Sequence, residues 1–95
     1  MRNYELTVII DPDIAEEDVP QTMEKLTALV AKSGGGVNEI NHWGRRKLAY
    51  PIGHRGEGNY VMMKVEFEPA KIAKFESSLN LAEEYLRHLL VRLGD

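Results

Sequence analysis

Alternation of apolar and polar side chains along two stretches constrains the fold more than any other feature. Between residues 4 and 10, the even positions are all apolar, and Glu5 and Thr7 lie between them. Between residues 60 and 67, the odd positions from Val61 to Phe67 are all apolar. A period of two is typical of a β-strand, because successive side chains point to opposite faces. Both stretches are therefore predicted to be strands with one apolar face.

Two helices are predicted between and after these strands. Asp11-Pro12-Asp13 ends the first strand, and the acidic residues that follow suit a helix N-terminus between Glu16 and Pro20. Gly34–Gly36 end this helix and offer a left-handed cap. Pro69 opens the second helix. Helical spacing predicts the buried positions, which are Val19, Met23, Leu26 and Val30 in the first helix and Ile72, Phe75 and Leu79 in the second.

The remaining segments complete a sheet. Residues 37–52 form an extended segment interrupted near Gly44, and a turn over 53–59 joins it to the strand at 60–67 in a long hairpin. Residues 85–93 fit a helix or a strand, the strand placing Tyr85, Leu89, Val91 and Leu93 on one face. The order β-α-β-β-α then favours the strand. This order predicts a ferredoxin-like fold, a four-stranded antiparallel sheet with two helices on one face, as one domain over residues 1–95.

Composition limits the classes of function. The chain has 95 residues, no cysteine and a net charge of −3. A domain of this size needs its apolar residues for packing, so a large substrate cavity is not expected. No apolar run approaches the ~20 residues of a membrane-spanning helix, and a soluble intracellular protein is predicted. Net acidity argues against nonspecific coating of nucleic acid but allows a localised basic patch.

Catalytic patterns are not found. His42, His54 and His88 have no metal-ligand spacing, and Gly34–Gly36 lack the Lys-Ser/Thr of a phosphate loop. Acylphosphatases have the same topology, but they bind phosphate with an Arg in the loop after the first strand. Here that loop carries acidic residues, which would repel an anion. We predict no enzymatic activity, no cofactor and no metal.

RNA-recognition motifs share the topology too, and they stack bases on aromatic residues of the third strand. The segment from Arg55 to Val61 begins like that motif, but Glu57 and Asn59 occupy the positions of the stacking rings. Recognition of bases by aromatic stacking is therefore not predicted.

A basic segment stands out in this acidic chain. The window from His42 to Gly58 has a net charge of +3, against −6 for the remainder, which has 8 Lys+Arg and 14 Asp+Glu. Edge strands often carry such charge to prevent aggregation, but arginine is also the preferred donor to phosphate. On a hairpin turning near residues 55–57, positions 45–47 would lie ~25–30 Å from Arg55. Tyr50 is expected in the core, whereas Trp43 suits either core or a partner.

The segment Gly44-Arg45-Arg46-Lys47-Leu48-Ala49-Tyr50-Pro51-Ile52 resembles the hallmark of the bacterial small-subunit ribosomal protein six family. The similarity extends over the whole chain, from Met-Arg-x-Tyr-Glu at the start to Leu-Arg-His-Leu-Leu-Val-Arg near the end. It implies the ferredoxin-like fold and a structural role in the ribosome, in the cytoplasm. It also implies binding to the central domain of small-subunit ribosomal RNA together with small-subunit ribosomal protein eighteen.

The resemblance implies RNA-facing roles for a set of basic residues, namely Arg2, Arg45, Arg46, Lys47, Arg55, Arg87 and Arg92. It implies that strand edges and exposed apolar residues serve the partner protein, whose contact residues no motif marks. Arg45→Ala with Arg46→Ala is expected to weaken RNA binding without unfolding. The alternative is a protein-interaction module whose charged edge strand has no direct role with RNA.

Overall fold

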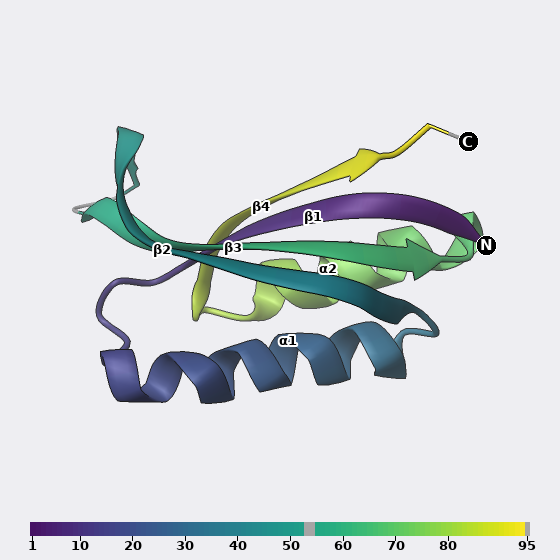
Figure 1. Ribbon diagram of the computed structural model, residues 1–95, viewed down its shortest axis with the longest axis horizontal. Helices are drawn as coiled ribbons and strands as arrows, with labels where there is room; N and C mark the ends of the chain where they lie inside the picture. The colour runs from purple at the N-terminus through teal and green to yellow at the C-terminus, as the bar shows by residue number, and fades with distance from the viewer. Residues whose placement is uncertain (53–54, 95) are drawn as a thin grey trace.

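A computed structural model describes residues 1–52 and 55–94, arranged as a sheet above two helices (Figure 1). The first helix is preceded by a 3-10 turn at Glu16–Asp18, and the second by one at Pro69–Lys71. The strands are β1 (Arg2–Ile10), β2 (Gly36–Ile52), β3 (Arg55–Phe67) and β4 (Tyr85–Arg92), and the helices are α1 (Val19–Lys32) and α2 (Ile72–Leu81).

The sheet has the order β2-β3-β1-β4, and each neighbouring pair is antiparallel. Both helices cover the same face, and the opposite face, which we call the outer face, carries no helix (Figure 1). The predicted ferredoxin-like arrangement is therefore confirmed. No helix among residues 1–52 and 55–94 combines the length and apolar character that crossing a membrane requires.

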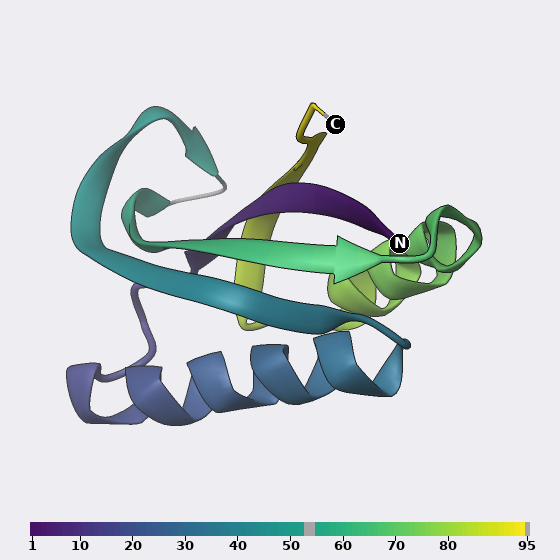
Figure 2. The same ribbon diagram turned by 45° about the vertical axis from the view of Figure 1, so that its right-hand side comes forward.

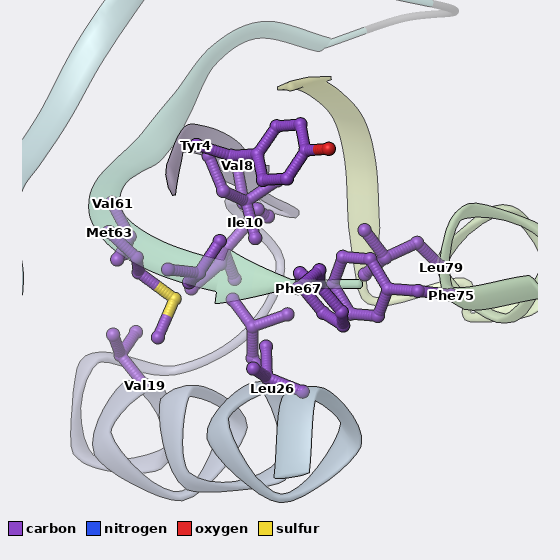
Figure 3. Packing of buried hydrophobic residues seen from close by; sticks show 13 residues of the cluster. Tyr4, Val8, Ile10, Val19, Leu26, Val61, Met63, Phe67, Phe75 and Leu79 are labelled. Atoms are coloured by element: carbon purple, nitrogen blue, oxygen red, sulfur yellow. The ribbon is translucent and has the colours of Figure 1, made fainter. Parts of the chain in front are cut away.

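The core lies between the sheet and the helices, and it contains the apolar faces predicted from the two alternating stretches (Figure 3). Phe67 of β3 and Phe75 of α2 are both fully buried, and their ring centroids lie 4.8 Å apart in a tilted arrangement. This pair joins the second helix to the sheet. From α1, Val19, Leu26 and Val30 complete the core, while Met23 packs against it from a partly buried position.

Helix α1 ends just before the glycines, as predicted from the sequence. Gly34 has a positive φ of 89°. Its backbone N–H donates to the carbonyl of Ala31 (3.1 Å), and that of Gly35 donates to the carbonyl of Val30 (2.9 Å). This pair of bonds is a Schellman cap, in which a glycine adopts the left-handed conformation at little steric cost. The cap turns the chain directly into β2.

Strand β4 confirms the strand interpretation but corrects its predicted face. Leu6 and Leu90 are opposite each other and both contribute to the core, so the neighbouring Leu89 and Val91 point to the outer face. Leu89 is 63% exposed and Val91 46%. A register shift next to Ile10 inserts one extra residue, which is why Tyr85 still faces the core. The alternation rule fails here because the bulge reverses the faces along the strand.

Tyr85 connects β4 to α1, and this contact predicts a pH effect. Its hydroxyl donates to the carbonyl of Thr22 (2.8 Å). Burial, and secondly the negative charge of Glu84, raise the pKa of Tyr85 from 10.0 to about 12. A group whose pKa is raised by folding contributes stability below its unfolded pKa, and this contribution is lost between about pH 10 and 12. We expect Tyr85→Phe to cost about 0.5–1.5 kcal/mol at neutral pH.

The loss should shrink as the pH rises from 10 towards 12, because the wild-type protein loses the same contribution when Tyr85 ionises. Urea unfolding of both proteins across this range measures the difference. A cost for Tyr85→Phe that stays constant with pH would show that the hydroxyl does not titrate in the predicted way.

Candidate nucleic-acid interface

The hairpin of β2 and β3 extends beyond the rest of the sheet. Strand β1 pairs with β3 only as far as Asn59, so residues 46–52 and 55–58 project past it. We call these residues the projecting ribbon. It rises away from the helices and curves over on the side of the outer face (Figures 1 and 2). The basic segment of the sequence therefore lies on a protruding element that a large partner can reach.

A bulge at the base of this ribbon sets its direction. His42 pairs with Val61 and Gly44 with Tyr60, so Trp43 is an extra residue on β2. Gly44 has a φ of 84°, in the left-handed region that favours glycine. Bulges of this kind bend a strand and increase its twist. The predicted interruption near Gly44 is thus confirmed and accounts for the bend.

The predicted turn over residues 53–59 is wrong for most of its length. Ile52 pairs with Arg55, so residues 55–59 belong to β3 and not to a turn, while Gly53 and His54 lie outside the described residues. Lys47 pairs with Glu57, which is two positions from Arg55, or about 7 Å along the strand. The predicted separation of ~25–30 Å between positions 45–47 and Arg55 is therefore wrong. The prediction failed because β2 has more residues than β3 between the Lys47–Glu57 pair and the Ile52–Arg55 pair.

Arg45 is held by contacts within the protein. It pairs with Asn59 on the helix side of the sheet. Its guanidinium donates to the carboxylate of Glu57 at 3.0 Å and to the carbonyl of Pro12 at 3.1 Å, and Nε lies 3.8 Å from Glu16. Two carboxylates thus neutralise this cation. Arg45 links the base of the ribbon to the loop after β1. A variant without Arg45 would therefore lose both a positive charge and a contact that positions the ribbon.

We expect Arg45→Met, which keeps only the aliphatic part of the side chain, to lower the free energy of unfolding by about 1–2 kcal/mol. The loss combines one hydrogen bond to a backbone carbonyl with two partly exposed ion pairs. Urea unfolding measures it, and Arg45→Lys should recover only part of it, because one ammonium cannot reach all three acceptors. Wild-type stability in Arg45→Met would mean that the contacts do not hold the ribbon.

Arg46 and Lys47 differ from Arg45 in their surroundings. The register places Arg46 opposite Gly58 on the outer face and Lys47 opposite Glu57 on the helix side. Both are exposed. Within residues 1–52 and 55–94 neither forms an ion pair, and the Arg46 guanidinium carbon lies 6.0 Å from the centroid of the Trp43 ring. Because Arg46 faces away from the acidic loop after β1, it is the cation best placed to meet an external phosphate.

The aromatic residues of the segment are exposed rather than buried. Tyr50 is 78% exposed, so its predicted place in the core is wrong. Trp43 is 47% exposed, which makes it available to a partner. Tyr50 lies on the projecting ribbon, beyond the end of β1, and this ribbon rises away from the helices (Figure 1).

The other predicted RNA-facing residues divide between two ends of the molecule. Arg87 pairs with Ile9 on the outer face at the ribbon end, and it is exposed. Arg55 lies on β3 in the ribbon, and the placement of its side chain falls outside the described part of the structure. Arg2, opposite Phe67, and Arg92, opposite Tyr4, lie at the far end of the sheet and have interactions within the protein. The structure therefore brings together only the ribbon residues and Arg87.

The outer face also carries apolar residues whose exposure was not predicted from the sequence. Leu89 and Val91 are exposed there, next to β1. The signal was present in the sequence, because residues 89–91 of β4 are all apolar and adjacent residues of a strand face opposite ways. With no helix on this face, these side chains are available to another protein.

Comparisons with known proteins identify the family to which this sequence is similar. The sequence model of the family Ribosomal protein S6 matches residues 3–92. The chain is 39% identical to small ribosomal subunit protein bS6 of Dehalococcoides mccartyi over 95 residues, covering 100% of this chain and 87% of that protein. It is 43% identical to the bS6 protein of Bifidobacterium longum over 91 residues, covering 96% and 94% of the two chains.

Solved structures agree. The crystal structure of 30S ribosomal protein S6 from Thermotoga maritima superposes with a TM-score of 0.89 at 25% sequence identity, covering 97% of this chain and 87% of that one. The C-terminal domain of the MgtC protein from Mycobacterium tuberculosis gives a TM-score of 0.57 at 17% identity, which is a likeness of fold alone. The matches over the full length, together with the basic hairpin segment, show that this chain belongs to the ribosomal protein S6 family.

Proposed function

We propose that this chain binds the central domain of small-subunit ribosomal RNA together with small-subunit ribosomal protein eighteen. As a member of a ribosomal protein family it is a structural component of the small ribosomal subunit in the cytoplasm and not an enzyme. The observation that carries the proposal is the projecting ribbon, where exposed Arg46 faces outward without an ion pair to any described residue.

The charges around the ribbon support contact with phosphate on one side. Acidic residues occupy the helix side, at Glu16–Asp18 and Glu57, and they would repel RNA from that direction. On the outer face Arg46 and Arg87 lie at the same end of the sheet, on β2 and β4. Three strand spacings of about 4.8 Å separate these strands. Two arginines at this separation suit phosphates a few nucleotides apart on one RNA backbone, not adjacent ones.

The same arrangement supports a need for a partner protein. Each phosphate contact adds less than one unit to the slope of log K against log salt. Two or three such contacts therefore give only weak binding at physiological salt. The exposed apolar residues Leu89, Val91 and Trp43 offer surface that a second protein would cover. A basic partner would also complement the acidic residues after β1. The joint surface would then bind RNA more tightly than this chain alone.

Filter binding with a central-domain RNA fragment tests the proposal. We expect the isolated chain to bind weakly and the mixture with small-subunit ribosomal protein eighteen to bind specifically. Nanomolar specific affinity of the isolated chain would contradict the need for a partner. The alternative, a protein-interaction module without a role in RNA binding, predicts that a pull-down of the partner is the same with and without RNA, and that the complex binds RNA no better than the partner does.

A further inference from the structure

A second basic site lies at the end of the molecule opposite the ribbon. A groove of about 520 Å³ separates the C-terminal end of α1 from the beginning of α2, and these two segments lie side by side at one end (Figures 1 and 2). Its lining contains no acidic residue, and consists of Leu29, Lys32, Ser33, Gly34, Lys71, Lys74 and Ser78. The groove thus holds three of the six lysines of a chain whose net charge is −3.

The lysines of this groove form no ion pair with any carboxylate of the described residues. Elsewhere, Lys25 lies 4.0 Å from Glu84, and Lys64 lies 3.9 Å from Glu39. Among the described residues, Lys32, Lys71 and Lys74 have no such carboxylate, although Glu66 and Glu68 are close in sequence. Three adjacent positive charges without counter-charges repel one another, so an anion that binds between them removes this cost.

The three lysines are exposed, and the segments that carry them fix where they lie. A Cβ atom added to Gly34 would lie 2.9 Å from both Cδ and Nζ of Lys71. The Lys71 side chain therefore lies against the α1–β2 turn at Gly34, although it is exposed to solvent. Lys74 and Ser78 follow at intervals of three and four residues on one face of α2. The cations are presented together from fixed helices.

We propose that this groove binds the phosphate backbone of RNA, as a second contact separate from the projecting ribbon. Ammonium groups are point charges, and the groove has no aromatic side chain, so phosphate contact without base reading is the chemistry that fits. The longest dimension of the molecule is 36 Å. A chain with basic sites at both ends can therefore join two RNA segments. This inference rests on the proposed function and adds a surface that the ribbon does not include.

The test uses the preformed complex with the partner protein and a central-domain RNA fragment. Lys71→Gln with Lys74→Gln should lower the affinity about tenfold and reduce the slope of log K against log salt by about 1.8, if each lysine contacts one phosphate. Lys25→Gln is the control, because it removes a lysine charge of α1 that lies outside the groove. We expect the control to keep the wild-type slope within about 0.5.

A second measurement does not depend on removing charge. The chain has no cysteine, so Ser78→Cys places one reactive thiol in the groove for a tethered reagent that cuts or cross-links RNA. Reaction with RNA in the complex supports the site. If the groove variant and the control have equal slopes of log K against log salt, and the reagent at position 78 does not react with RNA, the groove proposal is wrong. The proposal for the ribbon would still stand. If the groove variant binds the partner protein more weakly in the absence of RNA, the ligand of the groove is an acidic surface of that protein instead of RNA. If the wild-type complex binds no RNA, both proposals are wrong.

Discussion

Removing the two outward-facing arginines at the ribbon end, by Arg46→Gln with Arg87→Gln, is expected to lower the affinity of the partner complex for RNA about 30-fold. Both side chains are exposed on the outer face, and neither forms an ion pair to a described residue. Each would contribute about 1 kcal/mol as a partly solvated charge-assisted contact. The slope of log K against log salt should fall by about 1.8.

Two comparisons make this result specific. Arg46→Lys with Arg87→Lys keeps both charges, so it should keep most of the salt dependence while losing the bidentate geometry. Lys47→Gln removes a charge from the helix side of the ribbon, where Glu57 is opposite, and its effect should be smaller than that of Arg46→Gln. If the double glutamine variant binds RNA like the wild type, the arginines serve only to protect an edge strand.

The largest effect on stability is expected from Phe67→Ala, which should lower the free energy of unfolding by about 3–5 kcal/mol. Phe67 is fully buried, and its ring is 4.8 Å from that of Phe75. Truncation removes this contact and leaves a cavity between β3 and α2. Because small domains have only about 5–15 kcal/mol of total stability, the variant would be close to unfolding.

Urea unfolding followed by far-ultraviolet circular dichroism measures this loss. Leu81→Ala is a suitable control, because Leu81 is 85% exposed at the end of α2 and its truncation should change stability by no more than about 0.5 kcal/mol. A cost below about 1.5 kcal/mol for Phe67→Ala would mean that the core closes around the missing ring.

Most of the fold could be predicted because local pattern and topology agree. The even positions of β1 and the odd positions of β3 are buried as their alternation indicates. The cap at Gly34 follows from glycine's access to positive φ. Periodicity alone could not place β4, since the register shift beside Ile10 depends on pairing with a strand about eighty residues away. Its outward-facing leucine was assigned to the wrong face for that reason.

The candidate site was predicted only in part, and the reason is again long-range geometry. Charge counting located the basic segment, but it could not distinguish Arg45 from Arg46. Arg45 already has partners within the protein, because the segment after β1 brings Pro12 and Glu16 within its reach, about thirty residues away in sequence. The basic groove was missed entirely, because its lysines come from two helices separated by β2 and β3.

The bulge that bends the ribbon also places a fluorescent residue at its base. Trp43 is the only tryptophan in the chain, it is the extra residue of that bulge, and about half of its surface meets water. An indole in this position changes its emission when a partner covers it or when the neighbouring guanidinium of Arg46 moves. Intrinsic fluorescence therefore reports on occupancy of the ribbon without any added label, and it does so separately from events in the core.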